Sequence, residues 1–192
     1  MGGVWERQIR SVKNVLSSLL KEHAARLDDE SLRTLLTEVE AIANSRPLSA
    51  EGLNDCSIEP LTPNHLLTMK SKVVLPPPGV FQKADVYCRK RWRTVQYLAN
   101  QFWNRWRKEF LTTLQERSKW KDKQHNLRVG DVVLMRDADA PRNKWPMGRV
   151  HEAVPGDDGL VRKVVVKRPE SNILVSRPIT KIVLLMKSTD DA

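Results

Sequence analysis

The feature that most constrains the fold of this chain is a change in the period of its apolar residues near residue 127. Before that point, apolar side chains recur every three or four residues, which is the spacing of one face of a helix. After it, apolar and polar side chains alternate, and turn residues separate the short runs, which is typical of β-strands. The sequence therefore predicts an α+β protein with a helical N-terminal half followed by a small β domain.

Residues 1–50 contain two amphipathic stretches, and we expect a helix in each. The first helix is expected over about 5–24, and the second after Asp28, whose side chain suits a helix N-terminus. The second must end before Arg46-Pro47, because a proline disfavours helical backbone in the residue before it. The expected apolar stripes are Trp5, Ile9, Val12, Leu16 and Leu19, and then Leu32, Leu35, Leu36, Val39, Ile42 and Ala43. Two short helices do not make a stable core alone, so we expect this segment to be the remnant of a larger domain.

Residues 51–82 are expected to connect the helical segments without long regular structure. Prolines at 60, 63 and 76–78 exclude a long helix or a central strand. Thr62 and Pro63 favour one helical turn at 62–67, with Thr62 as the cap and Pro63 in the first position.

Residues 83–124 contain almost no helix-breaking residue, and we expect one long basic helix over about 84–120. Its apolar positions fall close to a 3.5-residue repeat over about four heptads: Cys88, Trp92, Val95, Leu98, Phe102, Trp106, Phe110 and Leu114. An apolar stripe of this length needs a partner. The partner could be the first two helices, the β domain or a second copy of the chain.

Residues 125–187 are expected to form a small SH3-like or chromo-like barrel of five short strands. The expected elements are a turn and strand at 129–136, a strand at 145–154, a hairpin turn at 155–159, a strand at 161–167, a turn of helix at 177–182 and a last strand at 183–185. The polar tail, 188–192, is expected to be disordered.

Positive charge is concentrated in the second half of the chain. The formal net charge is +10, although residues 1–50 are balanced. Residues 81–126 carry twelve basic and four acidic side chains, and residues 127–187 carry twelve and seven. This points to a polyanionic partner, while a well-solvated Lys/Arg surface is the simpler alternative. The candidate phosphate contacts are Arg89, Arg91, Arg93, Arg105, Arg107 and Lys108 in the helix, and Arg142, Lys144, Arg149, Lys163 and Lys167 in the barrel.

Tryptophans interleave with the arginines of the long helix, which is typical of proteins that stack on nucleobases. Trp92, Trp106 and Phe110 lie on the expected apolar stripe, so burial is favoured for them. Trp103 lies off that stripe and is the better candidate for stacking.

Several other functional classes lack their motifs in this sequence. Cys56 and Cys88 are too few for a disulfide framework, and no Cys or His pair has zinc-ligand spacing, so an intracellular protein is expected. No P-loop, nucleophile–base arrangement, glycine-rich dinucleotide turn or membrane-spanning apolar run occurs. A methyl-lysine cage needs two or more aromatic rings, and residues 127–187 contain one, Trp145.

Three stretches carry a resemblance to a known family. They are GGVWERQIRSVK at 2–13, WNRWRKEFLTTLQERSKW at 103–120 and LRVGDVVLMRD at 127–137. The first resembles the end of the integrase catalytic core in BEL/Pao-type LTR retrotransposon polyproteins, and the others resemble the domain of unknown function that follows it. The resemblance covers nearly the whole chain. It implies the closing helices of a truncated RNase H-like core, one long basic helix and an SH3-like barrel.

The resemblance also implies roles for residues of the first helix. Glu6 matches the last ligand of an Asp-Asp-Glu site that binds two divalent ions. The two aspartates are absent, and the next carboxylate on the expected helix, Glu22, would lie about 24 Å away. No catalysis by this chain alone is therefore expected, and Mg2+ or Mn2+ would bind only if the rest of the core were supplied. Arg10 and Lys13 are implied DNA contacts, and an ion pair between Glu6 and Arg10 is the alternative.

The function implied by this resemblance is non-specific binding of double-stranded DNA during integration, as part of a larger retroelement polyprotein. The protein would act inside the cell, and in the nucleus if it acts on DNA. Self-association, or docking to the rest of an integrase, is implied as well. Two alternatives remain: a protein-interaction module whose basicity is incidental, and an inert fragment of a decayed element.

Overall fold

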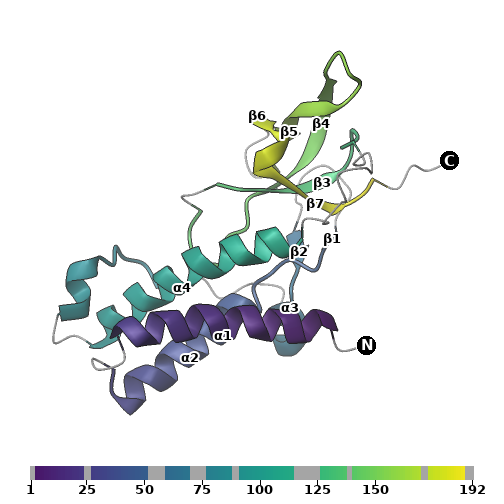
Figure 1. The fold of residues 1–192 in the computed structure, drawn as a ribbon. Coiled ribbons are helices and arrows are strands. Elements are labelled where there is room, and N and C mark those ends of the chain that lie inside the picture. Colours follow the sequence, from purple (N-terminus) through teal and green to yellow (C-terminus); the bar gives the residue numbers. More distant parts are fainter. Residues whose placement is uncertain are drawn as a thin grey trace. The chain divides into compact units, whose positions relative to one another are not determined.

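The computed structural model of the chain divides into two compact units (Figure 1). The helical unit comprises Met1–Arg46 and Pro63–Thr112, and the β unit comprises Pro47–Thr62 and Thr113–Ala192. The described residues are 3–23, 27–51, 59–69, 77–87, 91–114, 126–137, 140–169 and 173–188. The expected α+β class, with helices first and a sheet after them, is confirmed. Among the described residues, no helix is both long enough and apolar enough to cross a membrane.

The first two helices lie where the sequence predicts them, at Gly3–His23 (α1) and Asp29–Ala43 (α2). The Oδ1 atom of Asp28 accepts a hydrogen bond of 3.1 Å from the N–H of Ser31, which confirms the expected cap of α2. The buried face of α2 contains Leu35, Val39 and Ile42.

Two expected stripe residues of α1 and α2 are exposed. Leu36 is exposed because it lies roughly 90° around α2 from the centre of the buried face. Trp5 is exposed in the first turn of α1, while the buried residues of that helix, Val15 and Leu19, lie several turns further on. The expected burial of Leu36 and Trp5 is therefore wrong.

The proline-rich connection contains more regular structure than expected. Helix α3, Pro63–Thr68, confirms the expected helical turn, and the side-chain amide of Asn64 donates to the carbonyl oxygen of Ala41 at 3.0 Å. Strands β1 (Ser49–Glu51) and β2 (Glu59–Leu61) pair as a two-stranded antiparallel sheet that the sequence did not predict. Proline is tolerated in β2 because a strand of a two-stranded sheet has one edge that pairs with nothing in that sheet.

The long basic helix is shorter than expected. A 3-10 helix at Lys83–Tyr87 (η2) comes first, and α4 runs over Arg91–Thr113. The expected start of one continuous helix near residue 84 is wrong, because the carboxylate of Asp85 accepts a hydrogen bond of 2.7 Å from the N–H of Gln82 and closes a separate tight turn. The end of the expected helix, beyond residue 114, and Cys88 lie outside the described residues.

Most of the apolar stripe of α4 is covered within the described chain, but Trp92 in its first turn is exposed, so the expected burial of Trp92 is wrong. The buried members of the stripe are Val95, Leu98, Phe102, Trp106 and Phe110, as expected. Side chains of α4 reach both N-terminal helices, since Gln96 donates to Glu38 of α2 at 2.9 Å and Arg105 contacts Ser18 of α1 at 3.3 Å. Of the three partners considered from sequence, the first two helices are thus in contact with α4 (Figure 1).

The β unit contains one five-stranded antiparallel sheet in the order β6-β5-β4-β3-β7. The strands are β3 Val132–Met135, β4 Met147–Pro155, β5 Val161–Lys167, β6 Leu174–Pro178 and β7 Ile182–Met186. A 3-10 turn, Ile179–Lys181 (η3), precedes the last strand as expected. Two register shifts against β5 bend β4, which suits a small, strongly curved barrel. The core of the sheet contains Leu127, Val133, Met135, Val150, Val161, Val164, Val166 and Ile182.

Two residues fix the ends and the curvature of this sheet. The buried carboxylate of Asp131 accepts hydrogen bonds of 2.8 Å from the N–H groups of Arg128 and Ser188, so it joins the start of β3 to the end of β7. Gly148 lies where a Cβ atom would be 2.3 Å from a methyl group of Val166, so the close approach of β4 and β5 requires glycine there.

Candidate nucleic-acid interface

Three of the arginines expected to contact phosphate in α4 have carboxylate partners. Arg91 pairs with Asp28 at the start of α2. The Nε atom of Arg93 lies 2.7 Å from Oδ1 of Asp85, and Nη2 of Arg105 lies 3.4 Å from Oε1 of Glu22. These arginines hold the elements of the helical unit together, and their positive charge is partly compensated inside the unit.

The Arg93–Asp85 pair is the most enclosed of these contacts. Asp85 is buried, and its carboxylate receives Nε and Nη2 of Arg93 and the N–H of Gln82. The hydrogen bonds from Arg93, followed by the one from Gln82, lower the pKa of Asp85. Arg93 also donates to the carbonyl oxygen of Val80 at 3.1 Å, so its guanidinium is held by η2 and by the segment that precedes it.

Trp103 and Arg107 are buried, contrary to the expectation that they contact nucleic acid. Trp103 is 2% exposed and Arg107 is 5% exposed, and the guanidinium carbon of Arg107 lies 5.5 Å from the centre of the Trp103 ring. The 3.5-residue repeat identified only one buried face of α4, whereas Ala99, Trp103 and Arg107 form a second. Lys108 remains exposed, and Arg89 lies outside the described residues.

The residues of α1 that the family resemblance singled out are exposed. Glu6, Arg10 and Lys13 all lie on the surface of the helix, as their spacing predicts. Within the described residues, Glu6 and Arg10 form no ion pair, although one helical turn separates them. No group of three His, Cys, Asp or Glu side chains that could hold a metal ion occurs in the described part of the chain.

The register of the β unit brings three of the expected basic residues to one face. Val150, Val164 and Val166 point into the core, so the alternating positions Arg149, Lys163 and Lys167 point away from it. Arg149 lies directly opposite Lys167 on the neighbouring strand, and Lys163 lies four residues before Lys167. We call Arg149, Lys163 and Lys167 the basic face.

The neighbours of the basic face are mostly uncharged. Val154 is opposite Lys163, Glu152 is opposite Val165, and on the other side of β5 Lys163 and Lys167 face Pro178 and Leu174. Among the described outward positions of β4, β5 and β6, one residue, Glu152, carries a carboxylate. The face carries an excess of positive charge on a curved sheet, which is a surface that can receive a chain of phosphates.

The other two expected contacts in the β unit are separate from this face. Arg142 is only 4% exposed, so its expected contact with phosphate is wrong. It lies in the turn that precedes β4, and its burial is a tertiary effect that no local pattern indicates. Lys144 is exposed in the same loop.

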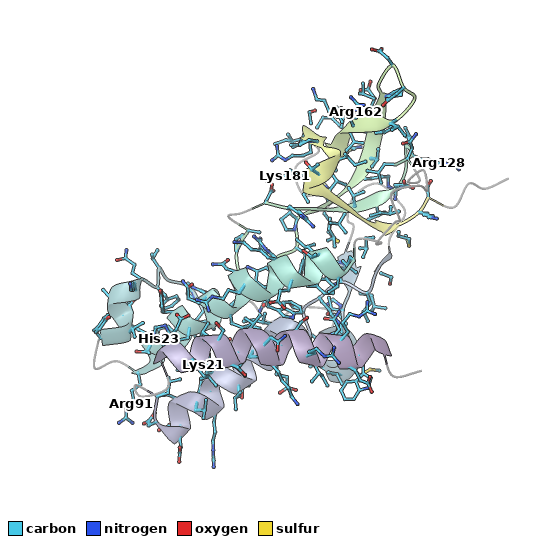
Figure 2. All side chains as sticks on the ribbon, viewed as in Figure 1. Lys21, His23, Arg91, Arg128, Arg162 and Lys181 are labelled. Carbon is cyan, nitrogen blue, oxygen red and sulfur yellow. The ribbon has the colours of Figure 1, made fainter. Side chains whose placement is uncertain are left out.

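Other arginines of the β unit have carboxylate partners. Nη2 of Arg168 lies 2.8 Å from Oδ2 of Asp137, and Nη2 of Arg177 lies 3.4 Å from Oδ1 of the same carboxylate. Arg162, labelled on β5 in Figure 2, lies 2.6 Å from Asp158. The N–H of Leu160 and then the charge of Arg162 lower the pKa of Asp158. The alternation of valine with lysine from Lys163 to Lys167 was the sequence signal that could have identified these two lysines as members of one face.

Comparison with known proteins adds one finding. No curated protein and no solved structure matches the chain. One family model matches residues 90–185, which include α4 and the five-stranded sheet with its basic face. The matched segment is half of the chain, and the chain therefore belongs to the Family of unknown function (DUF5641).

Proposed function

We propose that this protein binds double-stranded DNA without sequence preference, through the basic face of its β unit. The observation that carries the proposal is the register of β4 and β5, which places Arg149 directly opposite Lys167. Like charges in directly opposed positions destabilise an antiparallel pair. A phosphate backbone laid across the strands would neutralise this repulsion, and Lys163 extends the same positive surface along β5.

The resemblance of the sequence to BEL/Pao-type retrotransposon polyproteins supplies the biological setting of the proposal. DNA binding would serve integration, as part of a larger polyprotein and in the nucleus. Exposed Arg10 and Lys13 on α1 are the candidate contacts of the helical unit in that setting. Lys108 of α4 and Lys144 of the β unit are exposed and can add to the same electrostatic attraction.

We further propose that the chain alone does not cleave or join DNA. A divalent ion needs several carboxylate oxygens at short range, and Glu6 is a single exposed carboxylate. Glu22 on the same helix is engaged with Arg105. Strand transfer measured with Mg2+ or Mn2+ and the purified chain should stay at the level of a Glu6→Gln variant, and activity above that level would contradict the proposal.

Fluorescence anisotropy with a short random-sequence duplex tests DNA binding. Neutralisation of three phosphates predicts about a 40-fold loss of affinity between about 50 and 200 mM salt. The variant Lys163→Ala/Lys167→Ala should bind about tenfold or more weakly at low salt, and its salt dependence should be shallower because two phosphate contacts are gone.

The matched control is Lys181→Ala/Lys187→Ala, which removes the same charge from exposed positions of the same unit outside the basic face. Figure 2 labels Lys181 at the 3-10 turn before β7. The control should bind the duplex within about twofold of the unmodified chain, because its phosphate contacts are intact. Equal losses in both variants would show that total charge alone determines binding, and no binding at low salt would refute the proposal.

A second candidate function, docking to another protein, rests on a different surface. Apart from Trp92, the described apolar stripe of α4 is buried from Val95 to Phe110, so it is not accessible to a partner helix. Leu66, Leu67 and Met69, at and just after α3, are exposed and apolar. A second copy of the chain is the simplest partner, and sedimentation of the chain and of a Leu66→Ser/Leu67→Ser variant tests it: an oligomer that the variant dissociates would support self-association.

A further inference from the structure

Trp92 differs from the other aromatic residues of α4 because a large part of its ring is accessible. It is 49% exposed, whereas Phe102, Trp103 and Trp106 on the same helix are almost completely covered. A single exposed apolar side chain is common in proteins and by itself does not indicate a function. The aromatic and basic residues around Trp92 are what suggest a function for its exposed ring.

The ring of Trp92 is held in place from one side. Its centre lies 5.4 Å from that of Phe81, with an angle of 79° between the planes, which is an edge-to-face contact. The guanidinium of Arg93 lies over Phe81, 5.6 Å from the ring centre, and is itself fixed by Asp85 and the carbonyl oxygen of Val80. The hydroxyl of Thr94 also donates to the carbonyl oxygen of Asp85, at 3.0 Å, which ties η2 to α4.

This network gives the exposed ring little freedom. Ordering a flexible aromatic side chain costs free energy on binding, and a ring that is already ordered avoids that cost. The Asp85–Arg93 pair is therefore a support for Trp92 and Phe81, in addition to joining two elements of the helical unit.

The segment around Trp92 is strongly basic. Residues 81–93 contain five basic side chains and one acidic side chain, Asp85, and that carboxylate is buried against Arg93. Lys83 of η2 is exposed, and Tyr87 at the end of η2 is exposed as well, whereas Arg91 of α4 is paired with Asp28. Exposed aromatic rings beside exposed cations are the combination that binds single-stranded nucleic acid, through base stacking and phosphate attraction.

We propose that Trp92 is a stacking surface for an unpaired base of single-stranded nucleic acid, with Lys83 as a contact for an adjoining phosphate. A duplex hides the faces of its bases, so this activity is distinct from the binding of duplex DNA by the basic face of the β unit. The two activities lie on different units of the chain and do not depend on one another. Trp103, which the sequence favoured for stacking, is excluded by its burial.

The test compares two labelled ligands of the same charge. One is an oligothymidine of about twelve nucleotides, and the other is a chain with the same phosphates and no bases. The unmodified protein should bind the oligothymidine at least about fivefold more tightly, because stacking on an aromatic ring contributes that much or more per base. Equal affinity for the two ligands, or no binding of either at low salt, would overturn the proposal.

Variants of Trp92 identify the residue responsible. Trp92→Leu retains an apolar side chain against Phe81 but has no aromatic face, so it should lose the preference for the ligand with bases. Trp92→Phe should retain part of that preference, and thermal unfolding of both variants shows whether the helical unit is intact. A Trp92→Leu protein that is folded and keeps the full preference would refute the assignment.

The matched control is Trp5→Leu, which removes another exposed tryptophan from the same unit. Its preference for the ligand with bases should equal that of the unmodified chain. Duplex binding of Trp92→Leu should also be unchanged, which separates a failure of this proposal from a failure of the proposed function. If Trp5→Leu loses the preference as fully as Trp92→Leu, the assignment to Trp92 is wrong.

Discussion

In the helical unit, Arg91, Arg93 and Arg105 lie within ion-pair distance of carboxylates, whereas the outward positions of β4, β5 and β6 in the β unit carry three cations and one carboxylate. In the β unit Arg162, Arg168 and Arg177 also lie within ion-pair distance of carboxylates. The two units therefore differ in the grouping of three further cations on one face of the sheet and not in their arginine–carboxylate pairs. Net charge along a sequence does not show where the positive side chains gather on the folded surface, and attraction of a polyanion depends on that grouping. The β unit, with the smaller excess, has the better surface for a duplex.

The largest expected effect comes from a substitution that disrupts the core of the helical unit and leaves the β unit intact. Trp106 is completely buried and stacks between Phe102 and Phe110, with ring centres 6.4 and 5.3 Å away. Trp106→Ala should lower the free energy of unfolding of the helical unit by about 3–5 kcal/mol, because it leaves a large cavity. Thermal unfolding followed by circular dichroism measures the loss. Duplex binding should survive in the folded β unit, and its disappearance at a temperature where that unit is folded would contradict the comparison.

A smaller effect is expected from overpacking the β unit. An added Cβ at Gly148 would lie 2.3 Å from Cγ1 of Val166 and 2.7 Å from the carbonyl oxygen of Lys167. Gly148→Ala should therefore lower the stability of the β unit by about 1–3 kcal/mol and weaken duplex binding by moving Lys167. Urea unfolding and anisotropy measure the two effects. Gly159→Ala, at an open hairpin position, is a control for duplex binding, which it should leave unchanged.

The Asp85–Arg93 pair predicts a pH dependence of stability in the helical unit. The folded-state pKa of Asp85 is lowered, so its stabilising contribution is present above the ordinary pKa of an aspartate, about 3.9, and is lost as the pH falls through the lowered value. Asp85→Asn should reduce the unfolding temperature at neutral pH and have a diminishing effect below about pH 4. Asp157→Asn, at an exposed hairpin position of the β unit, is the control. An equal effect of Asp85→Asn at both pH values would show that the ion pair is not the cause.

The smallest expected effect comes from the exposed pair of Arg105 and Glu22. The side chains of Arg105 and Glu22 are 39% and 52% exposed, and Nη2 of Arg105 lies 3.4 Å from Oε1 of Glu22. Arg105→Ala should cost about 0.2–1 kcal/mol of stability and leave duplex affinity within about twofold, because the charge is partly compensated and screened. Lys163→Ala, which also removes one positive charge, should weaken binding more. The reverse order would favour α4 over the basic face as the duplex site.

Much of the secondary structure could be predicted from local patterns. The cap at Asp28, the helical turn at Pro63 and the strands β3, β4, β5 and β7 each depend on residues a few positions apart, which a sequence displays directly. Strand β6 was not located from the sequence. The separate turn at Lys83–Tyr87 was missed because no glycine or proline there interrupts the helical pattern. The turn is fixed by the hydrogen bond from the N–H of Gln82 to the carboxylate of Asp85, which the sequence does not show. The pair β1–β2 was missed because each strand has only three residues.

The candidate site was harder to predict because accessibility depends on distant parts of the chain. Arg105 meets Glu22, which is 83 residues away, and Gln96 meets Glu38, which is 58 residues away. Arg142 and Trp103 are covered although their local sequence is typical of a nucleic-acid contact. Lys163 and Lys167 share one face of β5, which the sequence could have indicated because alternation along a strand is a local property.

The carboxylate of Asp131 has a mechanical consequence. It holds the N–H groups of Arg128 and Ser188, so the chain enters β3 and leaves β7 at one point of the sheet. Because β3 and β7 are antiparallel neighbours, a force that pulls these two ends apart would load their hydrogen bonds one after another, as in opening a zipper. The β unit should thus yield at low force along this direction whatever its equilibrium stability, and the two bonds to Asp131 should be the first to break.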